Sequence, residues 1–157
     1  MTNPKPQKRF CIVGAGPAGL TVAKNFMQRG IDFDCYEKEA DLGGNWNFTN
    51  RSSSIYQSTH LISSKRLTEF TDFPMAKGIA PFPHHEQVLA YLHEYANHFD
   101  RRRNIRFDTS VVQIDRSDDS WTVRLNNDNR LLHYDGVVIA NGHHWDPLIP
   151  EMSGQFT

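Results

Sequence analysis

Cysteine is scarce in this chain of 157 residues, which contains only Cys11 and Cys35. Two cysteines suggest neither a disulfide framework nor a zinc site, and we expect a reducing, cytoplasmic location. The chain has no run of ~20 apolar residues that could span a membrane, and no apolar segment follows the polar residues 1–8 as in a secretory signal. The net charge of -1 lacks the basic excess expected of a nucleic-acid binder, so we expect no nucleic-acid partner.

The pattern of apolar residues indicates an α/β domain. Apolar or alternating segments predict strands at residues 10–13, 33–37, 110–116, 121–125, 131–134 and 136–140. Helical spacing predicts helices at 17–29 and 86–99, whereas residues 38–80 lack strong periodicity, which is typical of a loop that wraps a ligand. The initial strand-helix-strand unit indicates a parallel sheet, and the strands after residue 110 indicate an antiparallel meander.

Charged residues near the two helices are expected to face solvent. In the first helix Leu20, Ala23 and Met27 form an apolar side, and we expect Lys24 on the outside. The run Asp100-Arg101-Arg102-Arg103 is interpreted as a solvated helix end that complements the helix dipole. The alternative interpretation of this run is a phosphate-binding cluster.

A glycine-rich segment, Gly14-Ala15-Gly16-Pro17-Ala18-Gly19, lies between the first strand and the first helix and matches G-x-G-x-x-G. Glu37 ends the second predicted strand, and this context predicts a dinucleotide site rather than an unliganded turn. The glycines permit a tight turn and close approach of a pyrophosphate, to which the helix N-terminus offers N–H groups. The Glu37 carboxylate can accept hydrogen bonds from ribose hydroxyls and would repel a 2′-phosphate, so this site should not hold NADP.

The fingerprint alone does not separate NAD from FAD, because both cofactors use it. The segment that follows Glu37 favours FAD. Gly43 and Gly44 let a second backbone segment approach a ligand, and Trp46 offers a flat surface for a ring system. The alternative for Trp46 is an ordinary core or surface aromatic residue.

Together these segments resemble the flavin-containing monooxygenases, which are FAD- and NADPH-dependent enzymes that oxygenate soft nitrogen and sulfur centres. The resemblance begins at Arg9, reaches the last residue and is carried by residues 14–19, 41–48, 55–58, 63–65, 73–74, 87–92, 95–99 and 135–144. It implies a Rossmann-like FAD/NAD(P)-binding domain of the glutathione-reductase type, with a parallel sheet and a β-meander crossover.

The resemblance also implies cofactor-binding roles for individual residues. Glu37 would hold the adenosine ribose, Asn45 and Trp46 would lie near the isoalloxazine or ribityl chain, and Val111 would meet the adenine through backbone groups. The full set of expected cofactor-binding residues is Gly14, Ala15, Gly16, Pro17, Ala18, Gly19, Glu37, Lys38, Gly44, Asn45, Trp46, Leu61, Ile62, Ser63, Val111, Asn141 and Gly142.

One position departs from the family. Many members have an asparagine at the position of Ile62, where its amide is thought to steady the oxygenated flavin. Isoleucine cannot donate that hydrogen bond. His60 and the Ile62 position are therefore the candidates for a catalytic role near the flavin, and the alternative for His60 is a packing or solvent-exposed histidine.

Two histidine pairs, His84-His85 and His143-His144, could suggest a metal site. Because neighbouring residues on a strand point to opposite faces, we do not expect either pair to chelate a metal. We therefore predict no metal site.

The resemblance implies an NADPH-dependent flavin monooxygenase that oxygenates a nitrogen- or sulfur-containing small molecule with O2, through a C4a-hydroperoxyflavin. Two alternatives stay open. One is an isolated dinucleotide-binding module without turnover, and the other is an FAD-dependent NAD(P)H reductase, although the chain has no C-x-x-C dithiol. The expected partners are the small-molecule substrate and O2, with a possible homodimer of the full-length protein.

The length of 157 residues is too short for a complete enzyme with this activity. We expect residues 1–8 to be a disordered polar arm, residues 9–145 to form the FAD-binding domain, and residues 146–157 to begin a linker toward an NADPH-binding domain. The family pattern F-x-G-x-x-x-H-x-x-x-Y would begin near Phe156, and one G-x-G-x-x-G is present where the reaction needs two nucleotides. We interpret the chain as part of a longer protein and expect it to bind FAD weakly or not at all and to be inactive alone.

Overall fold

The computed structural model describes residues 8–99, 104–144, 146, 148, 150–152 and 154. Its helices are α1 (Pro17–Gln28), the 3-10 helix η1 (Gly44–Trp46), α2 (Lys65–Thr68) and α3 (His85–His98). Its strands are β1 (Arg9–Val13), β2 (Asp32–Tyr36), β3 (Ile105–Arg106), β4 (Val111–Ser117), β5 (Ser120–Leu125), β6 (Asp128–Tyr134) and β7 (Gly136–Ile139). Residues 1–7 of the expected arm and the run Asp100–Arg103 lie outside the described residues, as does part of the expected linker.

Four parallel strands form the central sheet in the order β3-β2-β1-β7. Phe10 on β1 lies opposite Phe33 on β2 and Gly136 on β7, so β1 is an inner strand. This confirms the parallel sheet expected from the sequence. Strand β3 was not predicted, because two residues are too few to give a periodic signal.

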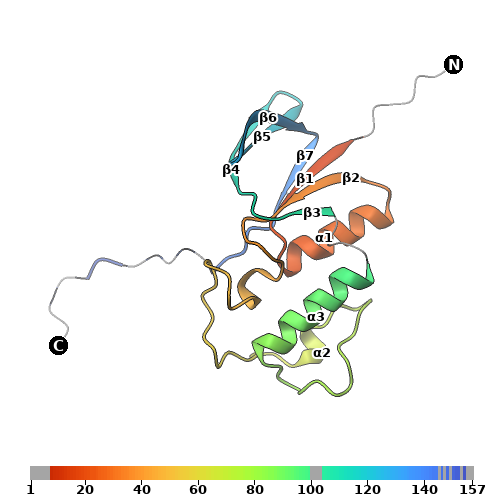
Figure 1. Ribbon diagram of the computed structural model, residues 1–157, viewed down its shortest axis with the longest axis vertical. Coiled ribbons are helices and arrows are strands. Elements are labelled where there is room, and N and C mark those ends of the chain that lie inside the picture. Colours follow the sequence, from red (N-terminus) through yellow and green to blue (C-terminus); the bar gives the residue numbers. More distant parts are fainter. Residues whose placement is uncertain are drawn as a thin grey trace.

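The strands β4, β5 and β6 form a separate antiparallel sheet, which confirms the expected meander. Strand β6 begins at Asp128, earlier than predicted, because Leu125 and Asp128 already pair across the turn. Figure 1 shows this small sheet on the side of the parallel sheet away from α1 and α3.

Side-chain alternation divides the core between the two faces of the parallel sheet. Ile12 and Cys35 lie in a cluster with residues of α1 and α3, such as Leu92. Cys11 and Tyr36, their neighbours in the chain, belong to a second cluster together with residues of the meander. The sheet is therefore covered on both faces, as parallel sheets usually are.

The segment before α3 is largely irregular, as predicted, but it is fastened to α3 by aromatic residues. The hydroxyl of Tyr91 accepts a hydrogen bond from the Phe70 N–H at 2.7 Å and donates one to the Phe73 carbonyl at 2.6 Å. The rings of Phe70 and Tyr95 lie 4.5 Å apart. Across the residues that the structure describes, no helix is both long enough and apolar enough to pass through a membrane.

Lys24 on α1 is not on the outside as expected. It is 9% exposed, forms an ion pair with Asp72, and its ammonium lies 5.4 Å from the centroid of the Phe99 ring. The pKa of Asp72 lies below its ordinary value because Lys24 hydrogen-bonds to it. The prediction was wrong because helical periodicity cannot show that a distant loop covers the polar side of a helix.

Candidate functional site

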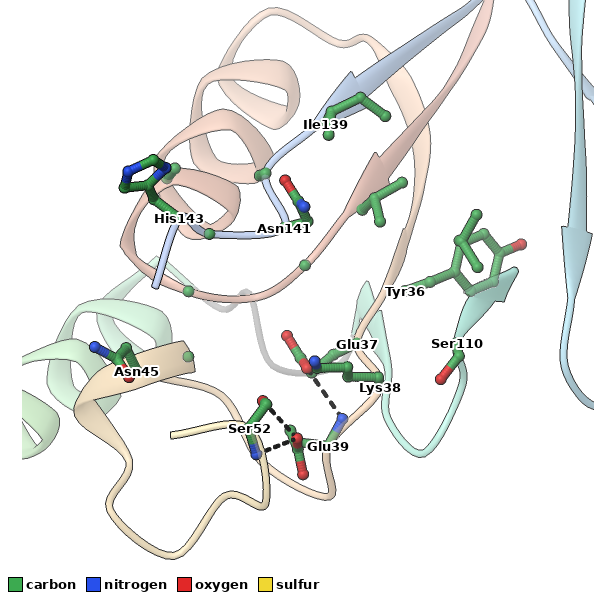
Figure 2. A pocket seen from close by; sticks show the side chains of 18 of the residues that line it. Tyr36, Glu37, Lys38, Glu39, Asn45, Ser52, Ser110, Ile139, Asn141 and His143 are labelled. Carbon is green, nitrogen blue, oxygen red and sulfur yellow. Dashed lines mark hydrogen bonds between the residues drawn. The ribbon is translucent and has the colours of Figure 1, made fainter. Parts of the chain in front are cut away.

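A cavity of about 770 Å³ lies at the carboxyl ends of β1, β2 and β7, beside the first half of β4. This volume is within the usual range of small-molecule sites, and the carboxyl ends of parallel strands are where such sites form in α/β folds. Figure 2 shows the cavity and the side chains around it. The lining residues are 13–14, 16–18, 36–39, 44–46, 52, 109–114 and 139–144.

The three glycines of the fingerprint have different surroundings. Gly14 has φ +103°, and a Cβ there would lie 2.5 Å from the Ala140 carbonyl oxygen. A Cβ on Gly19 would lie 1.9 Å from the Gly14 carbonyl oxygen, so these two glycines allow the backbone to pack against itself. Gly16 instead lines the cavity, and a Cβ there would have its nearest neighbour, the Gly44 Cα, at 3.7 Å.

A second glycine turn lies against the first. The Gly43 N–H donates a hydrogen bond to the Ala15 carbonyl at 3.1 Å, and both Gly43 and Gly44 have positive φ. The next residue, Asn45, accepts a hydrogen bond on Oδ1 from the Ser54 N–H at 2.8 Å. Gly16 of the first turn and Gly44 of the second both line the cavity.

Glu37 is a buried carboxylate in the cavity wall, 5% exposed. Its Oε2 accepts a hydrogen bond from the Ala15 N–H at 2.6 Å, and its Oε1 accepts one from the Glu39 N–H at 3.0 Å. The glycine turn and the end of β2 are thus held by the same side chain. Each carboxylate oxygen can accept a further hydrogen bond, which leaves Glu37 able to bind a ligand hydroxyl.

Glu39 and Ser52 close the rim of the cavity next to Glu37 (Figure 2). Oε1 of Glu39 accepts hydrogen bonds from the Ser52 hydroxyl at 2.7 Å and from the Ser52 N–H at 3.3 Å. Burial acts to raise the pKa of Glu39. The hydrogen bonds from Ser52 and from the Arg51 backbone, together with the charge of Lys38, lower this pKa by more, so it lies below the ordinary value.

The segment after β7 forms the opposite wall. Asn141 and Gly142 line the cavity, together with His143 and His144. The Ser54 hydroxyl donates a hydrogen bond to the His144 carbonyl at 2.5 Å, which joins this segment to the loop after η1.

Most of the residues expected to bind a cofactor lie in this cavity wall. Those that line it are Gly14, Gly16, Pro17, Ala18, Glu37, Lys38, Gly44, Asn45, Trp46, Val111, Asn141 and Gly142. Ala15 is buried in the turn, where it presents its N–H to Glu37, and Gly19 is buried in α1. Whether these residues bind a cofactor stays a prediction.

The structure does not bring residues 60–63 to the cavity. Leu61 is buried in the core with α3, and Ile62 is 100% exposed. The hydroxyl of Ser63 hydrogen-bonds to that of Thr68, and Nδ1 of His60 lies 2.8 Å from the Ser58 carbonyl oxygen. In this chain none of the four therefore contacts the space that the glycine turns enclose.

Several cavity residues were not predicted from the sequence. Tyr36, Glu39 and Ser52 carry no motif, and Ser52 at the rim is hydrogen-bonded to Glu39. The histidines 143 and 144 belong to the segment 135–144 that carries the resemblance, but no cofactor-binding role was predicted for them. Their position directly after β7, at the same sheet edge as the fingerprint, was the signal that could have placed them.

The reason given for excluding metal ligation by the histidine pairs is wrong for His143 and His144, which lie beyond the end of β7. It is also wrong for His84 and His85. These residues are not on a strand but at the beginning of α3, where His84 is the N-cap. Their ring centroids lie 4.2 Å apart. The centroids of His143 and His144 also lie close together, at 4.6 Å.

Comparison with known proteins assigns most of the chain to one family. Residues 7–155 match the family model described as flavin-binding monooxygenase-like. Dimethylaniline monooxygenase (N-oxide-forming) 2 from Macaca mulatta is 32% identical over 154 residues, which cover 91% of this chain and 29% of that protein. The chain thus spans less than a third of the length of this curated relative.

Solved structures show the same fold. The structure of S-allyl-L-cysteine S-oxygenase from Allium sativum is 27% identical with a TM-score of 0.83, and the match covers 94% of this chain and 39% of that chain. A steroid monooxygenase bound to NADP is 26% identical with a TM-score of 0.74, and the match covers 86% of this chain and 26% of that chain.

Proposed function

The chain belongs to the flavin-binding monooxygenase-like family, and from this premise we propose that its cavity binds FAD as part of an NADPH-dependent monooxygenase. The observation that carries the proposal is the joining of the two glycine turns to the buried Glu37 carboxylate around one cavity. A pyrophosphate needs accessible backbone N–H groups, and a ribose needs an acceptor for its hydroxyls. The glycine turn at the start of α1 would meet the first requirement and Glu37 the second.

The residues present fit FAD. Gly16 and the first turn of α1 would hold the pyrophosphate, Glu37 would accept the ribose hydroxyls, and Asn45 and Trp46 would lie beside the ring system or its ribityl chain. FAD supplies the redox chemistry with NADPH and O2 when it is bound. The protein's part is to orient the cofactor and to exclude water through the wall of β2, β4 and β7 residues.

For the complete protein we propose oxygenation of a small molecule at nitrogen or sulfur. This is supported by the names of two relatives, one an N-oxide-forming monooxygenase and the other an S-oxygenase. NADPH would bind outside the described cavity, because Glu37 would repel a 2′-phosphate there. We propose residues 9–145 as the FAD-binding domain and residues 146–157 as the start of a linker.

Two measurements test the proposal. In the first, FAD is titrated into the chain. We expect weak binding, with quenching of the FAD fluorescence that saturates at one FAD per chain.

In the second, the complete protein is supplied with NADPH, O2 and either a tertiary amine or a sulfide. The expected products are the N-oxide or the S-oxide, with NADPH consumed. Reduction of a disulfide without O2 consumption would favour a reductase, and a complete protein that binds no FAD would contradict the proposed cofactor.

A further inference from the structure

Three metal-ligating side chains meet at the N-terminal end of α3, outside the cavity proposed for FAD. His84, His85 and Glu86 each offer one ligand atom, and these atoms lie within 4.8 Å of one another. Glu86 is exposed, His84 is half-buried and His85 is buried, so the group extends from the surface into the protein.

His85 has unsatisfied hydrogen-bonding capacity. Its side chain is 3% exposed in the described structure, and both ring nitrogens are buried without a hydrogen-bond partner. Its ring neighbours are Phe48 at 5.5 Å and His84 at 4.2 Å between centroids. A buried polar nitrogen is normally paired, since leaving it unpaired costs free energy. A metal ion would use the lone pair of one of these nitrogens.

His84 is already oriented as a metal ligand. Its Nε2 lies 2.7 Å from the Gln57 carbonyl oxygen, which can only accept, so Nε2 carries a proton and in the neutral ring the lone pair is on Nδ1. Histidines that bind metals usually donate their other N–H to a carbonyl or carboxylate in this way. Nδ1 faces Oε2 of Glu86 at 3.5 Å and accepts only a long bond of 3.4 Å from the Glu86 N–H. With this tautomer, a lone pair faces a carboxylate oxygen, an arrangement that a cation between them stabilises.

We propose that His84, His85 and Glu86 form a binding site for a divalent transition-metal ion, with Zn²⁺ as the best fit. Two imidazoles and a carboxylate are a known zinc ligand set that leaves a fourth position open. Imidazole ligands also suit Cu²⁺ and Ni²⁺, whereas Mg²⁺ and Ca²⁺ prefer oxygen ligands. The Glu86 carboxylate offsets the partial positive charge of the helix N-terminus. Only modest side-chain movement is required, and the exposed Glu86 can supply it.

The site would fasten the loop before α2 to the beginning of α3. The His85 N–H already donates to the Thr59 carbonyl at 2.9 Å, and the Leu61 N–H donates to the Pro83 carbonyl at 2.9 Å. Because His84 also binds the Gln57 carbonyl, an ion at this point would hold residues 57–61 through the orientation of that ring. The expected effect of the ion is therefore to stabilise this loop against α3.

The test is a zinc titration of the chain without FAD, so its outcome does not depend on the proposed cofactor. Zn²⁺ is added in competition with a chromogenic chelator, and we expect saturation at one ion per chain and a higher thermal unfolding midpoint. Co²⁺ in place of Zn²⁺ is expected to give d–d bands without a thiolate charge-transfer band. Removing one ligand through Glu86→Gln or His84→Ala should weaken binding by at least about tenfold.

The matched control is His93→Ala, which removes a histidine from the same helix and should leave zinc affinity unchanged. His85→Ala is also informative if it folds, but Glu86→Gln carries the test because Glu86 is exposed and its substitution leaves the core intact. Zinc binding that does not saturate at one ion per chain, or that falls equally in His93→Ala, would overturn the proposal. So would unchanged affinity in Glu86→Gln, which would leave a protonated His84 paired with Glu86 as the reason for their proximity.

Discussion

Among the fingerprint glycines, Gly16 is the one whose missing side chain leaves room for the ligand in the cavity. We expect Gly16→Ala to fold, because its methyl group would meet the Gly44 Cα at an ordinary contact distance of 3.7 Å. The same methyl group would stand where a pyrophosphate approaches the backbone, and FAD affinity should fall by at least about tenfold, or about 1.4 kcal/mol. FAD titration measures this. Gly78→Ala is the control, because nothing lies within 4 Å of a Cβ there, and equal affinities in the two variants would contradict the placement of the pyrophosphate.

Glu37 is expected to stabilise the protein even without a cofactor. In Glu37→Gln one oxygen becomes an NH2 group, which then faces the N–H of Ala15 or of Glu39. Leaving one buried N–H unpaired should lower the free energy of unfolding by about 1–3 kcal/mol. Urea denaturation measures the difference, with the exposed Glu94→Gln as control. If both variants were equally stable, Glu37 would not be holding the glycine turn.

At the scale of elements, the meander is joined to the parallel sheet by a pair of buried tyrosines. The hydroxyls of Tyr36 on β2 and Tyr134 on β6 lie 2.8 Å apart, and Tyr134 donates to Oδ2 of Asp34 at 2.6 Å. Burial, followed by these hydrogen bonds, raises the pKa of Tyr134 above its ordinary value. The hydroxyl therefore stays protonated and able to donate.

Tyr134→Phe should lower the free energy of unfolding by about 1–3 kcal/mol, because Asp34 loses a donor and Tyr36 loses a partner. Urea denaturation measures this, and Tyr56→Phe is the control because Tyr56 is 78% exposed. A loss no larger than that of the control would mean that apolar packing alone holds the meander.

The bond between Glu39 and Ser52 should make the loop after β2 sensitive to acid. Because the pKa of Glu39 is lower in the folded protein than its ordinary value, its contribution is present above about pH 4.3 and is lost as the pH falls through the folded pKa. The contribution should stay below about 1 kcal/mol, since the carboxylate is partly solvated. Urea midpoints across this pH range should therefore fall less steeply in Glu39→Gln than in the unaltered chain. Parallel pH profiles would contradict this.

The elements with strong local signals were predictable. The β1-α1-β2 unit combines an apolar strand, a helical stripe and a glycine motif, and each of these depends only on neighbouring residues. Strand β3 and the burial of Lys24 were not predictable, because both depend on partners far away in the sequence.

At the candidate site, too, the residues with a local motif were predictable and those that depend on distant partners were not. The glycine turns and Glu37 were identified through their motif, and the structure places them in one cavity wall. Ile62 was selected by position in the resemblance, yet its side chain is fully exposed, since the loop that carries it packs through Leu61 instead. No local pattern distinguishes which of two adjacent apolar loop residues is buried.

At the scale of the whole molecule, the described fold accounts for one nucleotide site. The chain covers 29% of the length of the N-oxide-forming relative. We expect residues 1–157 supplied with FAD, NADPH and O2 to show no NADPH oxidation above that of free FAD, measured by loss of NADPH absorbance. Stoichiometric, tight FAD binding together with NADPH-dependent oxygenation by this chain would contradict the expectation.

Strand β7, an edge strand of the parallel sheet, completes the wall of the cavity. Gly136 of β7 pairs with Phe10 of β1, and the Ala140 N–H donates to the Val13 carbonyl at 2.9 Å, directly before the glycine turn. During synthesis the amino-terminal end leaves the ribosome first, and pairing between such distant segments is slow. The nascent chain therefore carries its glycine fingerprint without the strand that supports it until β7 has been synthesised. Cofactor capture is expected only after β7 has emerged.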